Sequence, residues 1–94
     1  MTYIILYTKK NCPFSSAAIE LCNSLRLPFK EFSIDGNHPK YIEIKTKLFQ
    51  KHNHYSFPIV IIGNTVLGGF SELKKTHENK KLYPMCIKNG INIY

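Results

Sequence analysis

Cysteine, acidic residues and long apolar runs are all scarce in this sequence of 94 residues. The three cysteines, Cys12, Cys22 and Cys86, are odd in number and widely spaced, with no C-x-x-C pair and no cluster with histidine. That spacing argues against a disulfide framework and against structural zinc, and it indicates reduced thiols. Tryptophan is absent, but 44% hydrophobic and 13% aromatic residues supply the apolar material for one folded domain.

The N-terminal apolar run, Tyr3 to Tyr7, is too short for a transmembrane helix. It also lacks the basic segment and the small-residue cleavage site of a signal peptide. We therefore expect a soluble, cytoplasmic protein that has no membrane partner.

Acidic residues number six against thirteen Lys and Arg, which gives a formal net charge of +7. Twelve of the thirteen are lysines, spread from Lys9 to Lys88 rather than gathered in one arginine-rich stripe. A dispersed pattern of this kind is typical of a solvated surface, and no aromatic-basic nucleic-acid motif accompanies it. We expect no nucleic-acid partner.

Hydrophobic periodicity and turn residues predict seven secondary-structure elements. The first helix is predicted from apolar residues at helical spacing, with Asn11 as N-cap and Pro13 in the first turn; Ser71 is predicted to cap the last helix. The order β-α-β-α-β-β-α predicts an α/β fold, a four-stranded mixed sheet flanked by three helices on both faces. The predicted strands are 3–7, 29–34, 59–62 and 65–67, and the predicted helices are 14–26, 40–51 and 71–82.

The last segment, residues 83–94, is set apart from a domain spanning 1–82. Its apolar residues Ile91, Ile93 and Tyr94 could pack as a short extra strand or lie loosely on the surface. The pattern leaves both open.

Cys12 is the strongest candidate for a reactive group. It follows a predicted strand and lies at the start of a predicted helix, where the unpaired N–H groups and the helix dipole favour an anion. Lys9 and Lys10 add positive charge nearby. Thiols in such settings have pKa values of roughly 3.5–7.5, so we expect a thiolate, the species that attacks disulfides.

Three segments in order resemble the glutaredoxin family. Residues 7–15, Y-T-K-K-N-C-P-F-S, resemble its active site, in which a strand and a lysine precede C-P-Y/F-C. Ser56-Phe57-Pro58 stands where the family has Thr-Val-Pro, and Gly68-Gly69-Phe70-Ser71-Glu72-Leu73 resembles its double-glycine stretch before the last helix. The resemblance covers about residues 1–82 and implies a thioredoxin-like fold and glutathione as the thiol partner.

The resemblance also implies a role for each matching residue. Cys12 would be the catalytic nucleophile, and Lys9 would meet the glycyl carboxylate of glutathione. Phe57, before a cis Pro58, would pair its backbone with the cysteinyl unit. The residues implied to contact glutathione are Lys9, Phe14, Phe57, Pro58, Gly69, Phe70 and Ser71, with the γ-glutamyl carboxylate at the Phe70 N–H and Ser71, where a helix start binds carboxylates.

Ser15 is the main departure from the family pattern, because a dithiol glutaredoxin has its resolving cysteine there. A serine restricts the implied activity to monothiol exchange on glutathionylated proteins or small disulfides. Whether Ser15 is native or replaces a cysteine is left open. Cys22 is expected in helix packing, whereas Cys86 could be exposed and act as a resolving thiol.

The sequence is compatible with three functions. The first is a monomeric glutathione-dependent thiol–disulfide oxidoreductase. The second is a homodimeric carrier of a glutathione-ligated [2Fe–2S] cluster held by Cys12, as in the C-G-F-S branch; Pro13 and a missing loop argue against it. The third is a basic adaptor of thioredoxin-like fold that has no chemistry and binds an acidic protein or nucleic acid. His54 and Tyr55 stand where the family often has Gln or Arg, which predicts weakened glutathione affinity.

Overall fold

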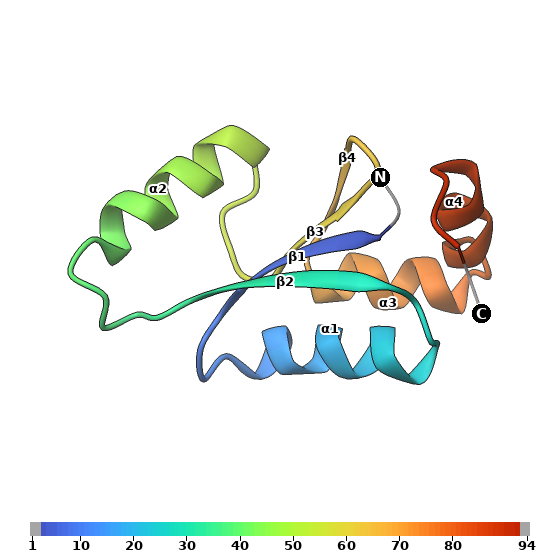
Figure 1. The fold of residues 1–94 in the computed structure, drawn as a ribbon, viewed down its shortest axis with the longest axis horizontal. Coiled ribbons are helices and arrows are strands. Elements are labelled where there is room, and N and C mark those ends of the chain that lie inside the picture. The colour runs from blue at the N-terminus through green and yellow to red at the C-terminus, as the bar shows by residue number, and fades with distance from the viewer. Residues whose placement is uncertain (1–2, 93–94) are drawn as a thin grey trace.

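The computed structural model describes residues 3–92 of the chain (Figure 1). They contain four strands and four helices. They are β1 (Ile4–Lys9), α1 (Pro13–Ser24), β2 (Phe29–Ile34), α2 (Tyr41–His52), β3 (Ile59–Ile62), β4 (Thr65–Gly68), α3 (Phe70–Glu78) and α4 (Leu82–Lys88). The predicted order of the first seven is confirmed, and the prediction of three helices is wrong because the tail adds α4.

The strands form one mixed sheet in the order β2-β1-β3-β4. β1 pairs with β2 in parallel and with β3 in antiparallel orientation, and β3 and β4 form an antiparallel hairpin. The register joins Leu6 to Val60 and Ile5 to Ile61, so alternate residues of each strand face opposite sides. The central strand β1 therefore ends next to the loop that carries Cys12.

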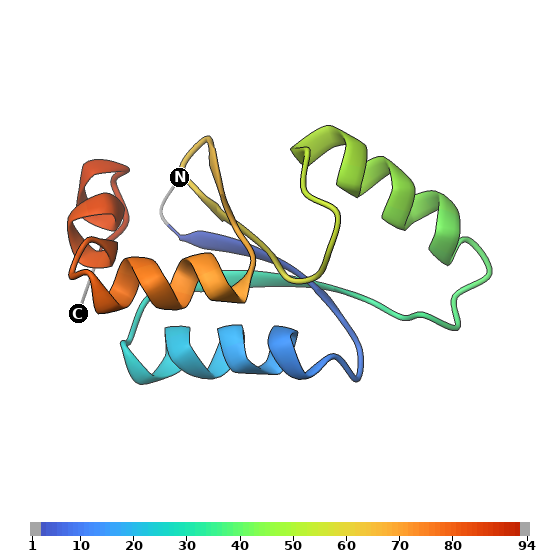
Figure 2. The same cartoon turned by 180° about the vertical axis from the view of Figure 1, so that it is seen from behind.

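One face of the sheet holds the core. Ile4, Leu6, Val60 and Ile62 point to this face and are fully buried. The helices α1 and α3 cover it and contribute Ala18, Cys22 and Leu73 to the same cluster. Figure 2 shows these two helices side by side beneath the strands. Their packing fixes the relative position of the two helix starts, which both lie toward the end of the sheet where β1 runs into the Cys12 loop (Figure 1).

The helix α2 lies on the other side of the sheet but covers little of it. None of its residues is buried. Its last turn reaches the sheet through His52, whose ring centroid is 5.3 Å from that of Tyr7 on β1. In both views α2 lies toward one end of the sheet, at the opposite end of the long axis from α4 (Figures 1 and 2).

The C-terminal segment forms a helix rather than the strand or loose tail that the sequence suggested. Leu82, Cys86 and Ile91 are buried in the same core as α1 and α3. Ile93 and Tyr94 lie outside the described residues. Within residues 3–92, no helix has both the length and the apolar content that crossing a bilayer would require.

Candidate active site

Cys12 lies at the junction between β1 and α1. It is the N-cap residue of α1, with extended backbone angles, and Pro13 follows at the first helical position. Asn11, which the sequence suggested as the cap, instead adopts a positive φ of 61° and turns the chain toward the helix. Asparagine tolerates this left-handed conformation better than most residues. The turn leaves the Cys12 side chain partly exposed at the N-terminal end of the helix dipole.

The surroundings of the Cys12 sulfur favour a thiolate. Partial burial raises the pKa of the thiol, but hydrogen bonds from the Ser15 hydroxyl and from the Ser15 and Phe14 N–H groups lower it. The charge of Lys9 lowers it further. The stabilising contacts outweigh burial, and the pKa of Cys12 lies below that of an ordinary cysteine.

Ser15 is held in place on both sides of its hydroxyl group. The residue is 2% exposed and lies in the first turn of α1. Its Oγ accepts a hydrogen bond from the Lys9 N–H at 3.3 Å, at the end of β1. The same hydroxyl keeps its one proton free to donate to the Cys12 sulfur, and this hydrogen bond lowers the pKa of the thiol. The sequence identified Ser15 only as a missing cysteine, whereas the structure places it as a hydrogen-bond donor to the thiolate.

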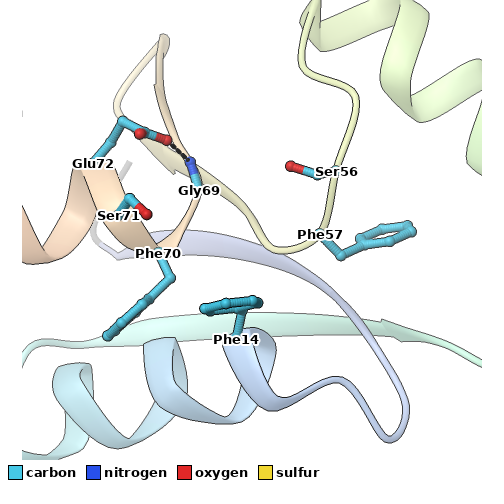
Figure 3. Close-up of a pocket in the computed structure, with 7 residues that line it drawn as sticks. All are labelled: Phe14, Ser56, Phe57, Gly69, Phe70, Ser71 and Glu72. Carbon is cyan, nitrogen blue, oxygen red and sulfur yellow. Dashed lines mark hydrogen bonds between the residues drawn. The ribbon is translucent and has the colours of Figure 1, made fainter.

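A groove of about 330 Å³ lies beside this helix start. Figure 3 shows the Phe14 and Phe70 rings together on the α1 side, with 6.4 Å between their centroids. Phe14 is 62% exposed, so its ring lines a surface and not the core. The groove is lined by Phe14, Ser56, Phe57, Gly69, Phe70, Ser71 and Glu72. Five of the residues that the sequence analysis assigned to glutathione therefore meet in one place.

The start of α3 forms one wall of the groove. Gly69, and not Ser71 as expected, is the N-cap residue, and the helix begins at Phe70. The Gly69 N–H donates to the Glu72 Oε1 at 2.7 Å. The first-turn N–H groups at Phe70 and Ser71 have no helical acceptor and can receive a carboxylate. Glu72 was given no role from the sequence, although a glutamate three residues after a helix N-cap is a capping signal.

The loop before β3 forms the opposite wall. The Phe57–Pro58 peptide bond is cis, as expected, and Pro58 is buried. The Phe57 ring points away from the groove toward α2, where its centroid is 5.1 Å from that of Phe49 (Figure 3). Phe57 consequently offers its backbone to the groove.

Lys9 lies outside this groove. It lines a separate hollow of about 300 Å³ together with Lys10, Asn11 and the turn at 35–37. Its Nζ is 5.4 Å from the centroid of the Tyr41 ring on α2. Lys9 contributes charge to Cys12, but the structure does not bring it together with Phe14 and Phe70.

The two residues before Ser56 point in different directions. The His54 Nε2 is 3.3 Å from the Ser56 Oγ and lies next to Gly69 at the edge of the groove. Tyr55 is 66% exposed and packs edge-on against Phe49. Of this pair, only His54 is within reach of a ligand in the groove.

The other two cysteines lie in the core. Cys22 and Cys86 are both fully buried. Burial, together with the nearby Cys86, raises the pKa of Cys22 to about 12, and burial raises the pKa of Cys86. The expectation of helix packing for Cys22 is confirmed. The prediction that Cys86 could be exposed is wrong, because α4 places this thiol in the interior.

Comparison with known proteins finds relatives in both fold and sequence. The fold matches that of a glutaredoxin from Brucella melitensis with a TM-score of 0.75 and 26% identity, covering 99% of this chain and 96% of that one. It matches buckwheat glutaredoxin, solved as a glutathione complex, with a TM-score of 0.83 and 23% identity over 95% and 81%. Glutaredoxin 3 of Escherichia coli K12 is 29% identical over 73 residues, which is 78% of this chain and 83% of the relative.

These matches define an α/β protein of thioredoxin-like fold with a four-stranded mixed sheet. The glutaredoxin family profile matches residues 4–67, which include Cys12 and Pro58 and end before Gly68. The chain therefore belongs to the glutaredoxin family of glutathione-dependent thiol–disulfide oxidoreductases.

Proposed function

We propose that this glutaredoxin reduces glutathione mixed disulfides by a monothiol mechanism, with Cys12 as its one working thiol. The observation that carries the proposal is the environment of the three cysteines. The Cys12 sulfur is partly exposed and hydrogen-bonded by Ser15, whereas Cys22 and Cys86 are fully buried. A buried thiol with a raised pKa neither attacks nor resolves a disulfide at neutral pH.

Two exchange steps then complete a turnover. In the first, the Cys12 thiolate attacks the glutathione sulfur of a mixed disulfide. The substrate S–S bond breaks, a bond between Cys12 and glutathione forms, and the substrate thiolate leaves and takes a proton from water. In the second, Cys12 is regenerated as a thiolate when a free glutathione thiolate attacks the same glutathione sulfur and leaves as glutathione disulfide.

The groove residues would hold the glutathione portion during both steps. The N–H groups at Phe70 and Ser71 are suited to the γ-glutamyl carboxylate, and the Glu72 carboxylate is suited to the neighbouring ammonium group. The exposed Phe14 ring and the Phe57 backbone flank the path from there to Cys12. Ser15 would keep Cys12 ionised for the first step and would stabilise it as the departing thiolate in the second.

The test is steady-state turnover of a small glutathione mixed disulfide, coupled to glutathione reductase and NADPH. We expect turnover by the unmodified protein, no turnover by Cys12→Ser, and turnover retained by the Cys22→Ala/Cys86→Ala double variant. A large loss in that double variant, with its fold intact by circular dichroism, would show that a second thiol takes part. Absence of turnover in the unmodified protein would overturn the proposal.

A further inference from the structure

The face of the sheet opposite α1 and α3 is only partly covered. Its register places four side chains in a row across the strands, Lys30 on β2, Ile5 on β1, Ile61 on β3 and Val66 on β4. Ile5 and Val66 are half-buried although no helix lies across them. The last turn of α2 covers Tyr7 in the adjacent row and stops there. The row from Lys30 to Val66 is thus left without a helical cover.

A hollow of about 380 Å³ lies over this row. Its floor is mainly aliphatic, formed by Ile5, Ile61 and Val66, with the Tyr7 ring beside them. Lys51 and His52 of α2 form one side, and the β3–β4 turn at 63–64 forms the other. None of its lining residues belongs to the groove beside Cys12. We call this hollow, with Lys30 at the end of the row, the α2-side hollow.

The charged side chains around the α2-side hollow are positive. Lys30 lies over two aromatic rings, 5.8 Å from the Phe32 centroid and 5.9 Å from that of Tyr3, and Lys51 lines the hollow itself. Neither lysine has a carboxylate partner among residues 3–92. Four of the six acidic side chains are engaged elsewhere: Glu31 with Thr8, Asp35 with Lys10, Glu43 with Lys47 and Glu72 with Gly69. The remaining two lie on α1 and α3, which cover the opposite face.

From this combination we infer that the α2-side hollow docks an acidic polypeptide segment with aliphatic anchor residues, supplied by a partner protein. The aliphatic floor takes the anchors, and Lys30 and Lys51 meet the flanking carboxylates. A second copy of this chain fits poorly, because each copy carries a formal charge of +7. Single-stranded nucleic acid fits poorly as well, because the Tyr7 ring already packs against Phe32 and His52, which leaves mainly aliphatic side chains where a base would need a ring to stack on.

Docking here would be independent of the thiol chemistry, since the two sites share no lining residue. A partner held in the α2-side hollow keeps the Cys12 groove open. The hollow would select the proteins that come near the thiol. Its lysines would attract acidic segments electrostatically, and its floor would bury their aliphatic anchor residues.

The test uses a fluorescein-labelled nine-residue peptide, Glu-Leu-Asp-Ile-Glu-Leu-Asp-Ile-Glu, titrated with the full chain at low salt and followed by fluorescence anisotropy. The expected result is saturable binding, with amide shifts in nitrogen–proton NMR spectra that concentrate on β1, β3 and β4. The Lys30→Glu/Lys51→Glu variant should bind at least tenfold more weakly. The matched Lys74→Glu/Lys75→Glu variant, on the exposed side of α3, should change affinity by less than about threefold.

Three results would overturn the inference. Equal affinity for a comparison peptide with serine in place of Leu and Ile would show non-specific attraction to a lysine-rich surface. Tighter binding of a ten-nucleotide oligothymidine, with shifts on the same strands, would assign the hollow to nucleic acid. Self-association in sedimentation that masks the same amides would assign it to a second copy. Both charge-reversed variants should keep turnover with the mixed disulfide, which separates a failure here from a failure of the proposed function.

Discussion

Replacement of Ser15 by alanine should reduce the reactivity of Cys12 without removing any atom of the thiol. The Ser15 hydroxyl donates to the Cys12 sulfur and accepts from the Lys9 N–H, and it is 2% exposed. A hydrogen bond to a charged group contributes about 1.5–3 kcal/mol. Because the sulfur is partly open to water, the lower end applies, about 1.5 kcal/mol, which corresponds to roughly a tenfold smaller thiolate population below the pKa.

The assay is the rate of Cys12 alkylation by iodoacetamide as a function of pH, read by intact mass. In Ser15→Ala, the pKa of Cys12 rises, so the midpoint of the profile moves to higher pH. At pH values below both midpoints the variant should react about tenfold more slowly, and above both the two rates should converge. A slightly faster limiting rate in the variant is expected, since a more basic thiolate is a better nucleophile.

Ser16→Ala is the matched control, because Ser16 is exposed and adjacent in the same helical turn. Its profile should coincide with that of the unmodified protein. A folded Ser15→Ala variant whose profile also coincides with that of the unmodified protein would contradict this prediction. The hydroxyl of Ser15 would then have no part in holding the thiolate.

The buried thiols and the lack of space for a side chain at Gly68 give two further predictions. Ellman's reagent should titrate one thiol in the native protein and three in urea, because Cys22 and Cys86 are fully buried; two fast-reacting native thiols would contradict that burial. Gly68→Ala should lower the free energy of unfolding by about 1–3 kcal/mol in a urea titration, because φ is +132° and a Cβ would lie 2.6 Å from the Glu72 Oε1. Gly36→Ala, whose Cβ would meet only the flexible end of a lysine, should cost less, and equal losses would argue against this strain.

Sequence patterns predicted most of the sheet because its strands are short and strongly apolar. Phe29–Ile34 and Ile59–Ile62 have the bounds expected from alternation and from a buried apolar run. The helix at Leu82–Lys88 was missed because Pro84 lies within it and the segment is short. Pro84 is tolerated there because it lies in the first turn, where the missing N–H breaks no helical hydrogen bond. The stability of this helix comes from burial of Leu82 and Cys86 against the rest of the core, which a local sequence pattern does not reveal.

The site shows the same division between local and distant contributions. Cys12 at a helix start and the groove residues Phe14 and Phe70 could be found from local spacing and family resemblance. The direction of Lys9 could not, because it depends on Tyr41, 32 positions away in the sequence. The donor role of Ser15 depends on its burial between β1 and α1, which no sequence pattern states. A glutathione-ligated [2Fe–2S] cluster stays a prediction from sequence alone.

One thiol, Cys12, is proposed to carry the glutathione during turnover. The most direct measurement is peptide mapping by mass spectrometry after the native protein is treated with glutathione disulfide. We predict one glutathione per chain, located on Cys12 and removed when free glutathione is added. A stable adduct on Cys22 or Cys86, or an intramolecular disulfide in place of the adduct, would contradict the monothiol mechanism.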